Sequence, residues 1–235
     1  ARAPRRRRRG GAARRSPGAP GRWRVVRAGG AELRRLYAVL LAAYGPQGWW
    51  PLPSRSGRAG FDAHGYHPGD PTAPDDRAGR FEIALGAVLT QNTAWINAER
   101  ALLALLAAGV RLPADILDCG LPRLASLVRP SGSYRVKARK LVGLAAFFLD
   151  RGLDVPPTRD DLLGVWGVGP ETADSIRLYA FRQPVFVVDA YTRRLLSRLG
   201  SIAGRETYDA VQDLFHRALA PDPGRFNRPS APAGP

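Results

Sequence analysis

Several residue types and patterns are rare or missing in this chain, and each absence excludes a structural feature such as a disulfide or a membrane-spanning helix. Its 235 residues contain one cysteine, Cys119, and no methionine. A single cysteine excludes an internal disulfide and fits a reducing cytoplasm. No apolar run approaches the roughly 20 residues that a membrane-spanning helix needs, and the arginine-rich beginning is not followed by the apolar core of a signal peptide. We therefore expect a cytoplasmic protein without a membrane partner.

Acidic residues and lysines are scarce beside arginine, which gives a formal net charge of +16. Residues 1–27 hold eleven of the arginines and no acid. Glycine, alanine and proline surround these arginines, so this part cannot bury apolar surface and residues 1–28 are expected to be a disordered arm. It either adds salt-sensitive DNA affinity or is an upstream misreading, since a start methionine is missing. The remaining chain is modestly basic, as a domain that meets phosphates would be.

Apolar residues make up 45% of the chain, which is enough for a real core. Residues 46–79 are rich in glycine, proline, aspartate and serine, and they are expected to form one long loop. Apolar spacing elsewhere predicts helices. The predicted helices cover residues 31–44, 81–90, 95–108, 121–128, 137–149 and 206–219.

The most informative stretch is residues 159–200. Two short helical patterns are separated there by Gly167, Val168 and Gly169, and Pro170 fits the first position of the second helix. The free N–H groups of such a turn suit a phosphate, although most turns of this kind are only compact corners between helices.

A short apolar run, residues 185–188, leads from this hairpin to Asp189. Asp189 directly precedes another helical pattern and fits its N-cap. From the residues alone, this structural role is favoured over catalysis.

Three segments carry a resemblance to a known family. GVGPETADSI followed by VFVVDAYTRR resembles the helix-hairpin-helix and aspartate signature of the endonuclease III (HhH-GPD) superfamily of DNA glycosylases. FEIALGAVLTQNTAWIN resembles the first barrel helix and loop of that family, and PSGSYRVKARKL a later element. Together they extend from about Arg35 to Leu214 in the family's order, which is more specific than a lone hairpin. The resemblance implies an all-α fold, with a six-helix barrel domain and a second, incomplete helical domain built from the N- and C-terminal helices.

The resemblance also implies how the chain is divided. After the arm we expect an N-terminal helix and a tryptophan-containing loop in residues 29–80. Residues 81–200 would form the barrel domain with the hairpin motif at 159–181, and residues 201–235 a C-terminal helix and tail. The family continues with more helix and a four-cysteine loop that holds a [4Fe–4S] cluster. Those cysteines are absent, so the chain resembles a member truncated at its C-terminus, and no cofactor is expected in it.

In the family, the aspartate aligned with Asp189 is both a helix cap and the catalytic carboxylate. A carboxylate beside C1′ stabilises the positive charge that builds on the sugar as a base departs. Bifunctional members have a lysine nucleophile where this chain has Glu171, and a Schiff base requires an amine. The resemblance therefore implies a monofunctional, monomeric DNA glycosylase of base excision repair that acts on double-stranded DNA at the nucleoid.

A base removed from the duplex is held between aromatic faces. The branch similar to 3-methyladenine glycosylases has a Trp-Trp-Pro, here Trp49, Trp50 and Pro51, and an aromatic residue at the position of Trp95. We interpret these four residues as the base pocket; the alternative is a hydrophobic plug over the core. Cationic alkylated bases leave readily and are attracted by tryptophan, so an alkylated base is the expected substrate.

Other DNA contacts are expected from loops. In the family, Gln91 projects into the gap left by the extruded base; otherwise the Gln-Asn-Thr triplet only caps a helix. Ser133 stands where the family often has a bulky wedge, so Tyr134 is the alternative wedge. The full expected DNA-binding set is Gly167, Val168, Gly169, Glu171, Thr172, Gln91, Asn92, Ser133, Tyr134 and Arg194.

Two other functions stay open. A bifunctional glycosylase and abasic-site lyase would take an amine from Lys137, Lys140 or the chain terminus. A non-catalytic hairpin module, or an inactive fragment, would only grip the DNA backbone.

No metal is expected. The segment FDAHGYHPGD groups His64 and His67 with Asp62 and Asp70, and its spacing would permit a metal ion. No fixed helical geometry supports such a site, so a solvated loop is the preferred interpretation.

Overall fold

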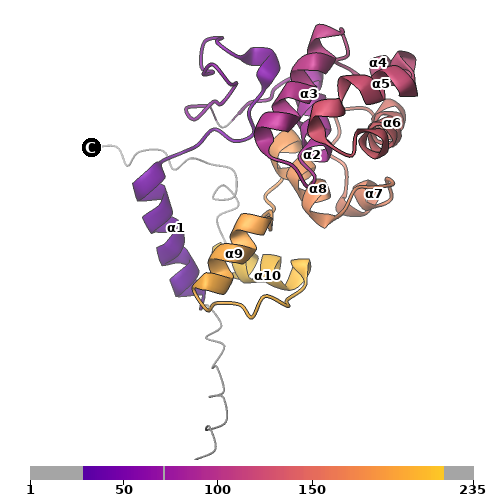
Figure 1. Ribbon diagram of the computed structural model, residues 1–235. Coiled ribbons are helices and arrows are strands. Elements are labelled where there is room, and N and C mark those ends of the chain that lie inside the picture. Colours follow the sequence, from indigo (N-terminus) through magenta and orange to yellow (C-terminus); the bar gives the residue numbers. More distant parts are fainter. Residues whose placement is uncertain (1–28, 71, 220–235) are drawn as a thin grey trace, which may run out of the picture.

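The computed structural model describes residues 29–70 and 72–219, and this part of the chain is all-α, as predicted (Figure 1). Its α-helices are α1 (Gly30–Tyr44), α2 (Arg77–Leu89), α3 (Trp95–Ala107), α4 (Pro113–Cys119), α5 (Leu121–Leu127), α6 (Tyr134–Arg151), α7 (Arg159–Leu163), α8 (Pro170–Ser175), α9 (Ala190–Arg198) and α10 (Tyr208–Leu219). Shorter helical turns are η1 (Pro53–Arg55), η2 (Arg129–Ser131) and the π-helical η3 (Ile176–Ala180). The expected arm, residues 1–28, lies outside the described residues, as does the end of the expected tail.

Local capping explains where the predicted helix boundaries were wrong. α2 begins at Arg77, because the side chain of Asp76 accepts the N–H of Gly79 at 2.6 Å. α6 begins at Tyr134, directly after Ser133 in the left-handed conformation with φ +42°. Residues 113–119 were not predicted as helical, although the proline that opens α4 fits a first helical position.

The buried apolar side chains form two separate cores, one in each lobe of Figure 1. The larger core surrounds α2, in which residues 81–89 are all buried. The smaller core joins Leu33 of α1 and Leu196 of α9 to Val211 and Phe215 of α10. α9 thus packs with the N- and C-terminal helices, whereas the sequence places residues up to 200 in the barrel domain. The chain passes from one core to the other just before Asp189.

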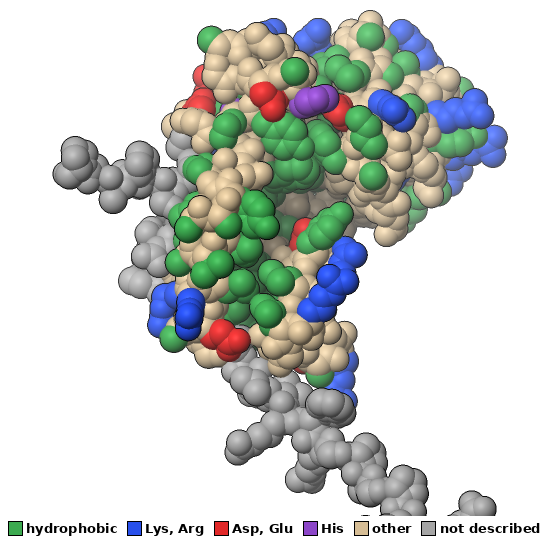
Figure 2. Space-filling view, turned by 60° about the vertical axis from the view of Figure 1, so that its left-hand side comes forward, with side chains coloured by type: hydrophobic (Ala, Val, Ile, Leu, Met, Phe, Trp, Pro, Cys, Tyr) green, Lys and Arg blue, Asp and Glu red, His purple; other side chains and the backbone are tan. Residues whose placement is uncertain are grey.

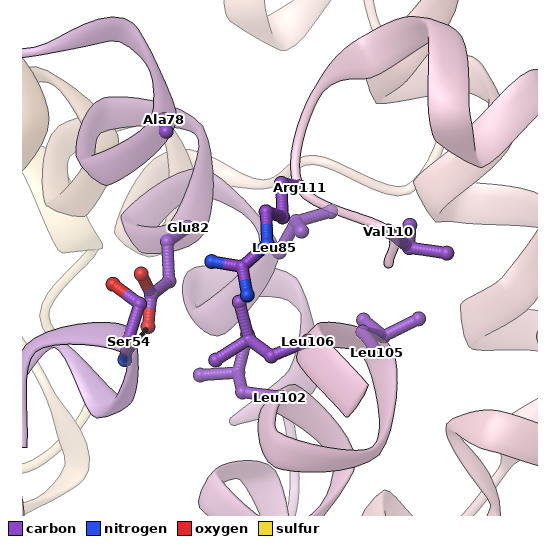
Figure 3. A pocket seen from close by; sticks show the side chains of 9 residues that line it. All are labelled: Ser54, Ala78, Glu82, Leu85, Leu102, Leu105, Leu106, Val110 and Arg111. Carbon is purple, nitrogen blue, oxygen red and sulfur yellow. Dashed lines mark hydrogen bonds between the residues drawn. The ribbon is translucent and has the colours of Figure 1, made fainter. Parts of the chain in front are cut away.

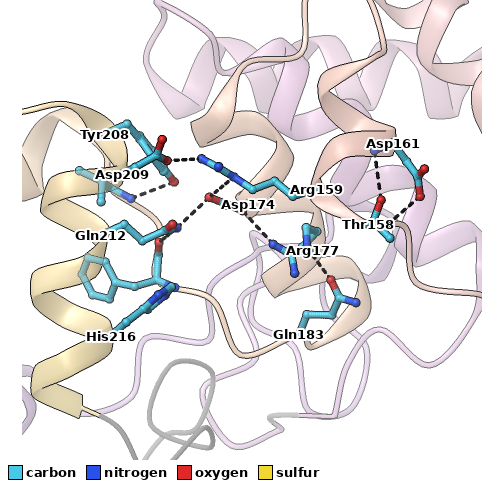
Figure 4. A network of polar contacts seen from close by, with 12 residues as sticks. Thr158, Arg159, Asp161, Asp174, Arg177, Gln183, Tyr208, Asp209, Gln212 and His216 are labelled. Carbon is cyan, nitrogen blue, oxygen red and sulfur yellow. Dashed lines mark hydrogen bonds and ion pairs between the residues drawn. The ribbon is translucent and has the colours of Figure 1, made fainter.

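A buried acid ties the two lobes together (Figure 4). The side chain of Asp174 in α8 is fully buried, with the guanidinium of Arg177 at 3.2 Å and that of Arg159 at 3.4 Å. From the other lobe, Gln212 of α10 donates to its second oxygen at 2.8 Å. The ring of Tyr208 lies 5.6 Å from the Arg159 guanidinium. A buried carboxylate needs such partners, so this network fixes how the lobes meet.

The long loop between α1 and α2 packs against the larger core. Trp50 and Leu52 are buried in it, and Leu52 donates its N–H to the Gly65 carbonyl at 2.9 Å. The interpretation as a solvated loop is wrong for His67, whose imidazole is buried with a nitrogen 2.9 Å from the Trp50 carbonyl. This loop is therefore a fixed support for its tryptophans.

Glu82 anchors the same loop to α2. Its carboxylate is buried and accepts the Ser54 N–H at 2.9 Å, and burial raises the pKa of Glu82. The cavity of about 30 Å³ beside it (Figure 3) has room for a single water molecule. The cavity is lined by Ser54, Ala78, Glu82, Leu85, Leu102, Leu105, Leu106, Val110 and Arg111.

Candidate active site

Asp189 lies at the junction of the two lobes and caps α9, as its position in the sequence predicts. Its backbone is extended, and its Oδ1 accepts the N–H of Thr192 at 2.7 Å. The other carboxylate oxygen, Oδ2, forms no hydrogen bond within the described chain. The side chain is only half-buried. One oxygen therefore holds the helix while the other is available to a ligand.

The charge of Asp189 raises the pKa of two nearby side chains. Burial and this charge raise the pKa of the Tyr179 hydroxyl. Partial removal from water and the same charge raise the pKa of Glu171, against the opposing effect of Arg193. The ring of Tyr179 lies 5.5 Å from that of Trp50. The charge of Asp189 therefore acts on a tyrosine that belongs to an aromatic cluster.

The structure brings together three tryptophans that the sequence assigns to a base pocket. The ring of Trp49 lies 5.2 Å from those of Trp50 and Trp95, and Trp50 and Trp95 are 5.6 Å apart in an edge-to-face contact. Trp50 is 5% exposed and forms the base of the cluster, whereas Trp49 and Trp95 are half-buried. Pro51 is buried next to them. Figure 2 shows hydrophobic side chains gathered in a hollow between the lobes.

Two tyrosines of this cluster were missed from the sequence. Tyr66 contacts Trp49 with ring centroids 5.9 Å apart, and Tyr179 contacts Trp50. Tyr66 lies in the long loop, whose path has no periodic signal. Tyr179 lies in the π-helical turn, where the interrupted helical period hides which face it occupies.

The hairpin turn adopts the expected shape. Gly167 has φ +85°, and a Cβ there would lie 2.6 Å from the side chain of Lys140, so glycine is required. The N–H groups of Gly167 and Gly169 form no hydrogen bond within the described residues. Val168 differs from the expectation of an open turn, because its side chain is buried and its N–H donates to the Val165 carbonyl at 3.0 Å.

Gln91 differs from the arrangement that the resemblance implies. Its amide does not project outward but donates to the Gly167 carbonyl at 3.1 Å and to the Thr172 hydroxyl at 2.9 Å. Its carbonyl accepts from the Lys140 ammonium at 2.5 Å. Thr172, also expected at the DNA, is buried. Both side chains instead fasten the end of α2 to the hairpin.

The two tips next to this network are exposed. Asn92 has φ +53° and Ser133 has φ +42°, and both lie at the surface. Tyr134 is a poor wedge, because it is partly buried against the larger core. Lys137 holds the second tip by donating to the carbonyls of Leu89 at 2.7 Å and Ser131 at 2.6 Å.

Exposed side chains flank the hairpin and Asp189. The Arg194 guanidinium lies 4.7 Å from the ring of Tyr191, which is 74% exposed. Trp166, directly before Gly167, is 61% exposed. Tyr191 and Trp166 were not expected at the site, although Tyr191 closely follows Asp189 and Trp166 directly precedes the hairpin glycines.

The residues present do not fit a [4Fe–4S] cluster, which needs four thiolates, because Cys119 in α4 is the sole cysteine of the 235 residues. Residues 29–70 and 72–219 also contain no group of three or more histidine, cysteine or acidic side chains that could hold a metal ion. The helices of this part include none with the length and apolarity to cross a membrane.

Comparisons with known proteins show what this chain is similar to. Residues 85–221 match the model of the HhH-GPD superfamily base excision DNA repair proteins. A Methanocaldococcus jannaschii protein named as a DNA repair glycosylase is 35% identical over 198 residues, covering 80% of this chain and 79% of its own. Endonuclease III of Thermotoga maritima is 31% identical over 143 residues, covering 59% and 67%.

Solved structures are similar as well. The H. pylori 3-methyladenine DNA glycosylase MagIII bound to 1,N6-ethenoadenine superposes with a TM-score of 0.61 at 30% identity, covering 81% of this chain and 82% of its own. A non-covalent endonuclease III–DNA complex has a TM-score of 0.65 at 21% identity, covering 84% and 80%, which shows the shared fold.

Proposed function

The chain belongs to the HhH-GPD superfamily of base excision DNA repair proteins, and from this premise we propose that it is a monofunctional DNA glycosylase for alkylated bases. The observation that carries the proposal is Asp189, which has one carboxylate oxygen in a helix cap, the other unused, and a charge that acts on Tyr179 of the aromatic cluster. The substrate is a damaged base everted from double-stranded DNA.

Asp189 supplies the electrostatic part of the reaction. As the bond between the base and C1′ breaks, positive charge builds on the sugar, and a carboxylate held next to it lowers the barrier. The cap bond to Thr192 keeps the carboxylate in place. Its free Oδ2 can also orient the water molecule that attacks C1′.

The aromatic cluster receives the base. Trp49 and Trp95 present partly exposed faces, with the buried Trp50 beneath them. Such faces stack on any base, and they attract a cationic one more strongly through the ring quadrupole. A positively charged alkylated base is also a good leaving group, which suits a site whose acid is mainly electrostatic.

The hairpin positions the strand without reading its sequence. The unpaired N–H groups of Gly167 and Gly169 suit a phosphate, and contacts of this kind set register rather than specificity. Arg194, Trp166 and the tips at Asn92 and Ser133 are exposed and can make further contacts with DNA.

Hydrolysis without a lyase step is proposed because no free amine accompanies Asp189 among the described residues. Lys137 is buried between two carbonyls, and Lys140 is bound to Gln91. Burial and the nearby Lys140 lower the pKa of Lys137 to about 8, but its hydrogen bonds hold it away from the surface. Glu171, on α8, cannot form a Schiff base.

The test is incubation of the full chain with duplexes that each carry one lesion, followed by separation with and without hot alkali. We expect release of an alkylated base, with strand scission only after alkali and no adduct trapped by borohydride. A borohydride-trapped adduct would establish a lyase instead. Tight duplex binding with no released base from any lesion would favour a non-catalytic hairpin module.

A further inference from the structure

One ion pair next to the aromatic cluster takes no part in the chemistry above. The Nδ1 atom of His64 lies 3.0 Å from Oε1 of Glu99. Glu99 is buried in α3, with 6% of its surface exposed, whereas the His64 side chain is 62% exposed. The contact therefore joins a buried acid to a histidine that solvent protons can reach.

Both elements that form the pair also carry residues of the aromatic cluster. Glu99 follows Trp95 by one turn of α3, so the two side chains share a face of that helix. On the loop, Tyr66 contacts Trp49, and burial together with the charge of Glu99 raises the pKa of Tyr66. Figure 2 shows histidine and acidic atoms at the rim of the hollow, above its hydrophobic floor.

Two acids from two elements act on the imidazole of His64. Glu99 comes from α3 and Asp62 comes from the loop. Asp62 fixes the loop by accepting the N–H groups of His64 at 2.8 Å and Tyr66 at 2.9 Å. The hydrogen bond and charge of Glu99, with a smaller effect of Asp62, raise the pKa of His64.

We propose that the His64–Glu99 pair selects bases by their charge. When His64 is neutral, the charged Glu99 carboxylate favours cationic alkylated bases over neutral ones, and protonation of His64 cancels that preference. This inference rests on the proposed function, because it requires the everted base to enter the aromatic cluster. It assigns a specificity role to residues outside the catalytic motif.

The sign of the pH effect follows from the charges. When His64 is protonated, the pair has no net charge and cationic and neutral bases meet similar fields. When His64 loses its proton, one negative charge remains beside the rings. At an effective dielectric constant near 20, a unit charge about 12 Å away favours a cation by about tenfold. Selectivity for cationic bases should thus rise as the pH rises through the raised pKa of His64.

The test compares single-turnover release from duplexes of one sequence that carry 7-methylguanine, which is cationic, or 1,N6-ethenoadenine, which is neutral. The proteins are the full chain, Glu99→Gln and His64→Gln, at about pH 6 and about pH 8.5, on either side of the histidine range. Comparing each variant with the unchanged protein at the same pH cancels the titration of the base itself. Circular dichroism checks folding, and the exposed His64 offers a variant that leaves the core intact.

We expect Glu99→Gln to lower the 7-methylguanine preference by about tenfold at the higher pH, and to lower it at the lower pH too, because protonated His64 is left there without its partner acid. His64→Gln should show the high preference at both. Equal preferences in all three proteins at both pH values, with release intact, would overturn this inference alone. Release of neither base by any of the proteins would overturn the proposed function and this inference with it.

Discussion

Asp174 and Asp189 lie on neighbouring segments, yet their surroundings are opposite. Asp174 is fully buried and has cationic or amide partners on both oxygens. Asp189 is half-buried and uses a single oxygen, in a cap bond to Thr192. A carboxylate whose two oxygens both have polar partners stabilises the fold, whereas a carboxylate with one oxygen unpaired can still interact with a ligand. Substitution of Asp174 should therefore change mainly stability, and substitution of Asp189 should change mainly catalysis.

The largest expected effect is on base release by Asp189→Asn. Removing the charge beside C1′ should lower the single-turnover rate by about a thousandfold, the upper range for loss of one electrostatic group. Asparagine caps helices as well as aspartate, so the free energy of unfolding and the affinity for duplex DNA should stay close to those of the unchanged protein.

Asp189→Ala is the matched control. It should lose base release equally and also destabilise the protein by about 1 kcal/mol, because the cap of α9 is gone. Undiminished release by Asp189→Asn would contradict the assignment of Asp189.

The reverse outcome is expected for Asp174→Asn. Leaving Arg159 and Arg177 without their buried partner should cost about 3–5 kcal/mol in the free energy of unfolding, measured by urea titration. The rate of base release per folded molecule should change little, because Asp174 belongs to the contact between lobes. A variant as stable as the unchanged protein would show that the network does not hold the lobes together.

Much of this arrangement could be predicted from the sequence, because strong local rules govern it. Pro170 and the glycines before it fix the hairpin, and the position of Asp189 before an apolar helix fixes its cap. The three tryptophans that match a family pattern do lie together, and their use as a base pocket stays a prediction.

The parts that could not be predicted depend on contacts between distant segments. Asp174 finds Gln212 across the two lobes, and Gln91 finds Lys140 and Thr172 across the barrel. The residues next to Gln91 in the sequence do not distinguish an amide that points to solvent from one that is hydrogen-bonded inside the protein. Side chains of the long loop, such as His64, likewise acquire partners only when the loop folds back.

A smaller effect is expected for Gln91→Ala. Because the Lys140 ammonium and the Thr172 hydroxyl lose a partner, the free energy of unfolding should fall by about 1–2 kcal/mol in thermal or urea unfolding. Asn92→Gly, at the exposed tip next to it, should be nearly neutral, because glycine adopts the positive φ of this position without strain. If Gln91 instead fills the gap in DNA, its loss would weaken binding to an abasic duplex and leave stability unchanged.

The smallest effect is expected for Arg194→Ala, which removes one exposed cation beside Asp189. Its affinity for duplex DNA should fall modestly, and the slope of log affinity against log salt should become shallower by about one. Arg194→Lys, which keeps the charge, should retain the slope. An unchanged slope in Arg194→Ala would place this side chain away from the DNA.

The most direct measurement is a structure of Asp189→Asn bound to a duplex with one alkylated base. We predict that the base lies everted against Trp49 and Trp95, with C1′ about 3.5 Å from the side chain at position 189, the distance of a reactive contact. A base that remains stacked in the duplex, or that occupies another part of the protein, would contradict the account.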